Sequence, residues 1–170
     1  MLHLQHVVNT TNRGLMETEL QNHFTDTIFY EIELTAKYCK MLGTQIFEDI
    51  DAGITIDEFA TLDTIFCNPD ICQRDLAKLI IKDRANTGKI LDNLENMGYI
   101  ERQLSVKNNR PVKISKLTPK GTQKVIEISE VLKPHTDMIK SKILNSDLKQ
   151  LKTMLQEFRD VMNESLDMKI

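Results

Sequence analysis

The chain has 170 residues, of which 41% are hydrophobic and 28% charged, values typical of a globular protein, and its formal net charge is −3. No apolar run reaches the roughly 18 residues of a membrane-spanning helix, and the N-terminus lacks the pattern of a secretory signal. Three cysteines and four scattered histidines lack metal-ligand spacing, and no phosphate loop or nucleophile motif occurs. Composition therefore predicts a cytoplasmic protein without cofactor or metal, and not an enzyme.

The N-terminal third predicts a polar tail and then one long helix. Residues 1–15 are polar, whereas apolar residues recur mostly at four-residue steps from Met16 to Ile50. Such a stripe is typical of an amphipathic helix. A helix of this length usually packs against something beyond its own domain. The alternative is that the stripe is ordinary core of a single domain.

Three short helices are predicted next, each with its own start signal. Thr55 opens the first with a capping box, Cys72 stands at the start of the second, and Asp83 caps the third. The side chains expected to be buried by the second and third helices are Leu76, Leu79, Ile80, Thr87, Ile90, Leu91 and Leu94. Two short helices joined by three or four residues, the second closing at Gly98, describe a helix-turn-helix.

A change of period then predicts a β-hairpin followed by two C-terminal helices. Residues 99–115 contain two strand-like runs around a basic turn, Lys107–Pro111. Thr118–Pro119 starts the next helix, expected to run towards Pro134, and Ser146 starts the last one. The predicted fold class is therefore mainly α with a small β-hairpin wing (α+β).

Short motifs along the C-terminal two-thirds carry a family likeness. They are Ile54-Thr55, Leu76-Ala77, Asp83-Arg84, Leu94 to Ile100 and Leu117 to Gly121. Their order and spacing resemble the MarR family of bacterial and archaeal transcription regulators. The resemblance implies a winged helix-turn-helix lobe over residues 54–121, with dimerisation segments at 16–52 and 122–170. It also implies a homodimer that binds a pseudo-palindromic operator in double-stranded DNA and responds to a small-molecule effector.

Three positions depart from the family pattern. The wing usually holds an Asp-x-Arg, whereas this chain has Asn108-Asn109-Arg110, which keeps the arginine and lacks the aspartate that would orient it. The turn before the third short helix reads Ile81-Lys82, where glycine and an apolar residue are common. Peroxide-sensing members carry a cysteine roughly where Ile28–Ile32 stand, so the resemblance does not extend to that thiol switch.

The third short helix is the expected recognition helix. If its apolar face points inward, the side chains that point outward or flank that face are Arg84, Ala85, Asn86, Gly88, Lys89 and Asn93. Arg84 suits guanine and Lys89 suits phosphate, while the small Ala85 and Gly88 allow close approach to DNA. Asn86 suits adenine, but it is also placed to close the cap of Asp83. The alternative for the charged residues is a solvated helix face.

The predicted wing carries a basic tip suited to phosphates or to the minor groove. Its candidate contacts are Lys107, Asn109, Arg110 and Lys113. The alternative is an ordinary polar hairpin whose edge is protected by charge and proline. Because the hairpin directly follows the helix-turn-helix, we favour DNA contact.

The resemblance also suggests an effector cleft between the dimer helices and the lobe. Residues of the right kind to line it are Phe24, Ile28, Phe47, Phe59, Leu62 and Phe66, which fit an ordinary core equally well. We interpret the protein as a repressor. Two alternatives stay open. One is a winged helix that contacts proteins, and the other is a thiol-based redox sensor that uses Cys67 or Cys72. The simpler interpretation of both cysteines is a structural role.

The weakly acidic net charge of the chain hides an uneven distribution of charge along it. Residues 72–124 hold twelve Lys and Arg against five Asp and Glu, so this segment carries +7, whereas the remaining chain carries −10. A basic reading lobe joined to acidic helices is compatible with DNA as partner, although the total alone argues against it.

Overall fold

A computed structural model describes residues 23–107 and 109–166. It divides into two compact units, Met1–Asp49 and Ile50–Ile170, which we describe separately. No helix in the described ranges is both long and apolar enough to cross a membrane.

The first unit contains a short 3₁₀ helix, η1 (Phe24–Asp26), and the long helix α2 (Ile28–Asp49). Thr27 between them has extended backbone angles, and its hydroxyl donates to the Phe24 carbonyl at 2.6 Å. The prediction of one unbroken helix from Met16 is therefore wrong at this point, because an extended residue interrupts the helical hydrogen bonds. The N-terminal part of that prediction, residues 16–22, and the expected tail lie outside the described residues.

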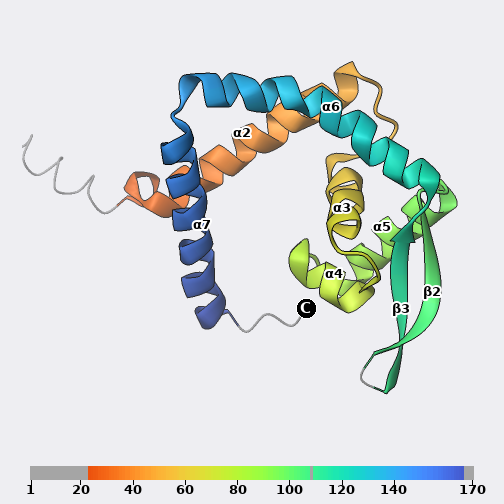
Figure 1. The fold of residues 1–170 in the computed structure, drawn as a ribbon. Helices are drawn as coiled ribbons and strands as arrows, with labels where there is room; N and C mark the ends of the chain where they lie inside the picture. The colour runs from red at the N-terminus through yellow and green to blue at the C-terminus, as the bar shows by residue number, and fades with distance from the viewer. Residues whose placement is uncertain (1–22, 108, 167–170) are drawn as a thin grey trace, which may run out of the picture. The chain divides into compact units, whose positions relative to one another are not determined.

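The second unit begins with three helices, α3 (Ile56–Cys67), α4 (Gln73–Leu79) and α5 (Arg84–Asn96) (Figure 1). Thr55 forms the predicted capping box at α3, since its hydroxyl accepts from the Glu58 amide at 3.2 Å and Glu58 accepts from the Thr55 amide at 2.8 Å. Asp83 caps α5 as predicted, whereas Cys72 precedes α4 without a side-chain cap bond. The three predicted helix starts are confirmed.

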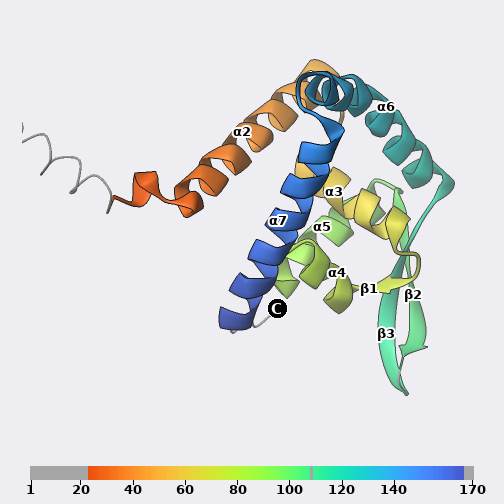
Figure 2. The same ribbon diagram turned by 60° about the vertical axis from the view of Figure 1, so that its left-hand side comes forward.

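A three-stranded antiparallel sheet follows these helices. The strands are β1 (Ile71–Cys72), β2 (Ile100–Lys107) and β3 (Arg110–Leu117), in the order β1-β3-β2. Strands β2 and β3 form the predicted wing and extend beyond α4 and α5 in both views (Figures 1 and 2). The sequence analysis missed β1, because two residues carry no periodicity and pair with β3 more than forty positions away.

The base of the wing is closed by backbone contacts. The Thr118 amide donates to the Tyr99 carbonyl at 3.0 Å, and the Thr118 hydroxyl donates to the Gly98 carbonyl at 2.7 Å. A Cβ on Gly121 would stand 1.9 Å from the Tyr99 oxygen, so only glycine fits there. This glycine lets the next helix lie directly against the chain that enters the wing.

The last two helices are α6 (Pro119–Lys142) and α7 (Asn145–Ser165). Helix α6 continues past Pro134, where the sequence predicted an end, because loss of one N–H donor bends or weakens a long helix without always stopping it. Helix α7 begins at Asn145, one residue before the predicted Ser146, and none of its residues is buried.

The core of the second unit lies where α3, α4, α5 and α6 meet the sheet. Its fully buried large side chains are Leu62, Ile65, Leu76, Leu91, Leu94 and Ile128. Thr87 is buried and Ile90 half-buried, as the apolar face of α5 predicts. Leu79 is exposed, contrary to the prediction, because α4 ends there and the chain turns towards α5.

Candidate nucleic-acid interface

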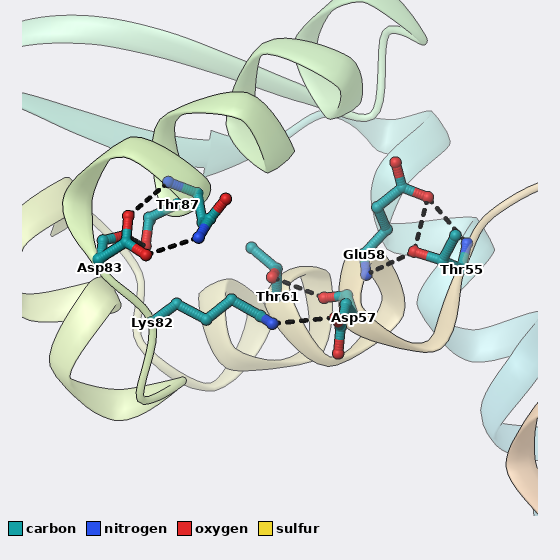
Figure 3. Close-up of polar contacts among 8 residues, drawn as sticks. Thr55, Asp57, Glu58, Thr61, Lys82, Asp83 and Thr87 are labelled. Carbon is teal, nitrogen blue, oxygen red and sulfur yellow. Dashed lines mark hydrogen bonds and ion pairs between the residues drawn. The ribbon is translucent and has the colours of Figure 1, made fainter. Parts of the chain in front are cut away.

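The start of the recognition helix α5 is fixed by polar contacts with its own first turn and with α3. The Asn86 amide donates to Asp83 Oδ1 at 2.8 Å, and this bond lowers the pKa of Asp83. The Thr87 hydroxyl donates to the Asp83 carbonyl at 2.8 Å, and Lys82 Nζ donates to Asp57 Oδ2 at 2.9 Å (Figure 3). These contacts hold the start of α5 in place in the protein without a partner.

The turn before α5 contains a left-handed residue. Ile81 has a φ of +51°, a conformation that glycine adopts without cost and a β-branched residue does not. The Lys82 side chain forms an ion pair with Asp57 at 2.9 Å. Glycine, which is common at position 81 in the family pattern, would therefore fit this backbone with less strain than isoleucine.

The six predicted residues of the recognition helix divide into two groups. Arg84, Ala85 and Lys89 are exposed, whereas Asn86 donates through its side-chain amide to Asp83 Oδ2 at 2.5 Å. The cap was the alternative interpretation of Asn86, and the structure contains that contact. The remaining two residues, Gly88 and Asn93, have neighbours within the lobe.

Gly88 and Asn93 lie beside other side chains of the lobe. A Cβ on Gly88 would approach Gln73 Nε2 to 3.3 Å, and Gln73 donates to the Arg84 carbonyl at 3.1 Å. Asn93 lies 3.5 Å from Glu58 Oε1 through its amide nitrogen, although its surface is exposed. Gly88 therefore leaves space for the Gln73 side chain where α4 and α5 meet.

The wing turns over two residues, with Lys107 paired to Arg110 across the hairpin. Asn109 has a φ of +59°, which asparagine tolerates better than most residues. Lys107, Asn109, Arg110 and Lys113 are all exposed, so the four predicted contacts are gathered at the outer half of one hairpin.

Arg102 joins the wing to the recognition helix. Its Nε donates to Glu95 at 2.9 Å, its Nη2 donates to Asp92 at 2.7 Å and also to Glu95, and its side chain is 16% exposed. This guanidinium lowers the pKa of Glu95, because a hydrogen-bonded cation favours the carboxylate. Sequence reasoning missed this cluster, whose only signal was two acids on α5 preceding a basic strand residue.

A second ion pair ties the wing to α4. Lys107 Nζ donates to Asp75 Oδ2 at 2.6 Å, and this bond lowers the pKa of Asp75. Lys116 contacts Asp70 at 3.2 Å near the base of the wing. One of the predicted wing contacts, Lys107, therefore already has an acidic partner.

Ion pairing separates structural cations from available ones. The cations of residues 72–124 that are paired with acids are Arg74, Lys82, Arg102, Lys107, Lys116 and Lys124. Within the described ranges no ion pair involves Arg84, Lys89, Arg110 or Lys113, all of which are exposed. Lys78 on α4 and Lys120 on α6 form no ion pair there either, and Lys120 Nζ lies 4.8 Å from the centroid of the Tyr99 ring. Most of the unpaired cations of residues 72–124 therefore lie on α5 and the wing.

The six candidate cleft residues fall in both compact units. Phe24 and Ile28 are exposed and Phe47 is buried in the first unit, while Leu62 is fully buried and Phe59 half-buried in the second. Phe66 is exposed and lines a cavity of about 340 Å³ with part of α3, β3 and the start of α6. Their common membership of one cleft stays a prediction.

The cysteines differ in access. Cys67 is exposed at the end of α3, whereas Cys72 is 4% exposed and lies in β1. Both are free thiols. A redox role for Cys72 would need an oxidant to reach a buried sulfur, which favours the structural interpretation for this residue.

Comparison with known proteins supports the resemblance of the lobe to the MarR family. The MarR family profile matches residues 54–112, from the residue before the α3 cap into β3, and so contains the helix-turn-helix and most of the wing. Residues 54–112 of the chain are similar to the MarR family. This family consists of transcription regulators and not of enzymes.

A relative in Bacillus subtilis (strain 168) supports the same assignment. YybA, named an uncharacterized HTH-type transcriptional regulator, is 32% identical over 92 residues. The alignment covers 54% of this chain, and the chain spans 58% of that relative's length.

Solved MarR-type structures share the fold at low sequence identity. The chain superposes on a MepR–DNA complex from Staphylococcus aureus with a TM-score of 0.69 and 21% identity, covering 82% of this chain and 99% of that one. For wild-type MarR from E. coli the TM-score is 0.63 at 20% identity, with 78% and 96% covered. For SlyA it is 0.68 at 24% identity, with 81% and 95% covered. The winged helix fold predicted from the sequence is confirmed.

Proposed function

We propose that the protein is a homodimeric transcription regulator that binds a pseudo-palindromic operator and represses by blocking promoter access. The observation that carries the proposal is the placement of the unpaired cations Arg84, Lys89, Arg110 and Lys113. Two lie on the recognition helix and two on the wing, the elements that winged-helix proteins use for major groove and backbone or minor groove. The DNA in the MepR complex belongs to that protein and supports the proposal by analogy of fold.

Two identical subunits are supported by apolar surface on the helices outside the lobe. Helix α7 exposes Leu151, Met154 and Val161, and α2 exposes Tyr38 and Met41. Apolar faces of this extent usually mark an interaction surface. A second copy of the chain would bury these faces and supply the second recognition helix that a palindrome requires.

Control by a small molecule completes the proposal. An effector that binds better to a dimer with unsuitable spacing of its recognition helices would shift the population away from the DNA-bound form. The cavity beside Phe66 is the part of the predicted cleft that the second unit holds by itself. No effector class follows from its lining.

Selection of bound duplexes from a random DNA pool tests the function directly. We expect recovery of a two-fold symmetric sequence whose affinity falls steeply with salt, because each neutralised phosphate releases counterions. Lys89→Ala and Lys113→Ala should each lower the slope of log K against log salt by about 1 per subunit. Lys149→Ala is the matched control, since Lys149 is exposed on α7, outside the lobe, and should leave the slope unchanged.

One observation favours the protein-contact alternative. Leu104 and Val106 on the wing are 80% and 71% exposed, and phosphate binding does not require apolar side chains there. If the purified protein binds no duplex at low salt, DNA recognition is excluded and the wing becomes a protein-contact surface. Specific, salt-dependent binding excludes this alternative as the main function.

A further inference from the structure

One carboxylate at the start of α4 pairs with a cation of the wing. Asp75 Oδ2 accepts from Lys107 Nζ at 2.6 Å, and Asp75 Oδ1 lies 3.6 Å from Arg74 Nε. Strand β1, which ends three residues before Asp75, pairs with β3, and Cys72 in β1 is buried. The carboxylate therefore lies close along the chain to the sheet that carries the wing.

The outer half of the wing has few other attachments. Arg102 holds only the base of the hairpin against α5, and beyond it Leu104 and Val106 are exposed to solvent. Among the described residues of the outer wing, Lys107 is the one that forms an ion pair with the body of the lobe. The contact between Lys107 and Asp75 is therefore the described ion pair that joins the outer wing to α4.

An open cavity of about 630 Å³ lies between this part of α4 and β3. Its charged lining residues are all cationic: Arg74, Lys107, Arg110 and Lys113. A phosphodiester is the ligand that several cations around an open, water-filled cleft recognise best. Lys107 has three N–H donors, so its ammonium group can hold Asp75 and a phosphate oxygen together.

We propose that Asp75 is a positioning residue of the DNA interface, which holds Lys107 at the edge of this cavity so that the cations lining it bind a backbone phosphate. The inference rests on the proposed DNA-binding function and assigns a site to it. The chain has Asn108 where the family usually carries the wing aspartate. A carboxylate on α4 thus takes the orienting role that the wing itself lacks.

Positioning and simple charge predict opposite signs for Asp75→Asn. Removal of an acid from a DNA-binding face raises affinity if the acid acts only through its charge. If Asp75 positions the wing, the same change lowers affinity, because the wing must then be ordered at the moment of binding. Glu101→Gln is the matched control, since Glu101 is an exposed acid on β2 outside the ion pairs of the described lobe.

The test is a salt titration of affinity by fluorescence anisotropy, with a duplex selected by the unmodified protein. We expect Asp75→Asn to weaken binding about two- to five-fold, the range for one exposed ion pair, and Glu101→Gln to leave affinity unchanged or raise it. Lys107→Gln should also lower the salt slope by about 1 per subunit. Adding Asp75→Asn to Lys107→Gln should then cost less than Asp75→Asn alone. Asp75→Asn binding as tightly as the unmodified protein, or more tightly, would overturn the inference.

Backbone hydrogen exchange in the free protein supplies a readout without DNA. Asp75→Asn should accelerate exchange in the outer wing, residues 104–112, while α3 and the thermal midpoint stay unchanged. Unchanged exchange in the wing would overturn the positioning role. If the unmodified protein binds no duplex, the proposed function fails and the phosphate site fails with it. Normal duplex binding that Asp75→Asn does not weaken leaves the function standing and removes only this inference.

Discussion

The winged-helix lobe, residues 54–121, and the helix α7 obtain their stability in different ways. The lobe contains a buried apolar core, side-chain caps on α3 and α5, and ion pairs that join its helices to its wing. Helix α7 has no buried residue and no side-chain cap, although it carries a regular apolar stripe. The lobe is therefore stable through contacts within the chain, whereas α7 requires a surface outside the described contacts.

This contrast has a functional meaning. Reading DNA requires a rigid arrangement of recognition helix and wing, which local caps and ion pairs supply within one subunit. Setting the distance between two recognition helices requires an interface that can change. In the proposed dimer, a rigid lobe joined to a separately stabilised interface would suit a regulator whose affinity depends on spacing.

The largest expected effect comes from breaking the lobe at the base of its wing. Gly121→Ala places a Cβ 1.9 Å from the Tyr99 carbonyl oxygen, and because both atoms are on backbone, relief requires moving α6 or β2. We expect a loss of about 3–5 kcal/mol in the free energy of unfolding, measured by denaturant titration. Gly88→Ala is the control, since its Cβ meets only the flexible Gln73 side chain and helix propensity favours alanine. Equal stability of both variants would contradict the close packing of the wing base.

A charge on the apolar stripe of α7 tests the other half of the comparison. Leu151→Glu should weaken dimerisation by about 2–3 kcal/mol, because a carboxylate would lose its hydration in the interface. Sedimentation against concentration measures the change. Lys149→Glu, on the opposite side of α7, introduces the same carboxylate with an even larger change of charge and should leave the dimer intact. A monomeric unmodified protein, or dissociation by both variants, would refute the assignment of this stripe to the interface.

Loss of the guanidinium at the junction of wing and recognition helix should have a smaller effect. Arg102→Met leaves Asp92 and Glu95 without their cation, and we expect a loss of about 1–2 kcal/mol in unfolding free energy at neutral pH. The unmodified lobe keeps the Glu95 contribution above the usual carboxylate pKa and loses it as pH falls through the lowered native value. The Arg102→Met variant should lack this pH-dependent contribution to the free energy of unfolding. Parallel pH profiles of stability for the two proteins would show that the cluster contributes nothing.

Local signals were predictable from the sequence, and tertiary signals were not. The caps at Thr55, Asp83 and Thr118 depend on residues three positions apart, so the sequence displays both partners of each bond. The Lys107–Asp75 pair joins residues 32 positions apart, and nothing in either neighbourhood marks its partner. The three cations of the basic tip were therefore predicted as equivalent, whereas the structure separates Lys107 from Arg110 and Lys113.

Helix ends show the same division. Gly98 closes α5 as predicted, because a left-handed φ of +74° is a local requirement that glycine satisfies. Pro134 does not end α6, since packing along the rest of a helix can outweigh one lost hydrogen bond. The family pattern at Ile81 was visible as a departure, but only the backbone angle shows what the departure costs.

Ile81→Gly should give a small effect, and its sign should be a gain in stability. Ile81 is 63% exposed at a φ of +51°, so the variant loses little apolar burial and relieves a left-handed β-branched residue. The entropy of glycine in the unfolded chain offsets part of this, and we expect a net gain of about 0.5–1 kcal/mol in unfolding free energy. Ile81→Asn should give a smaller gain, because asparagine tolerates this region better than isoleucine but less well than glycine. Ile81→Val keeps the β-branch and should give none. A loss of stability in Ile81→Gly would mean that the exposed isoleucine makes a contact in solution. Because Ile81 lies in the turn before α5, that contact would place a partner surface beside the recognition helix.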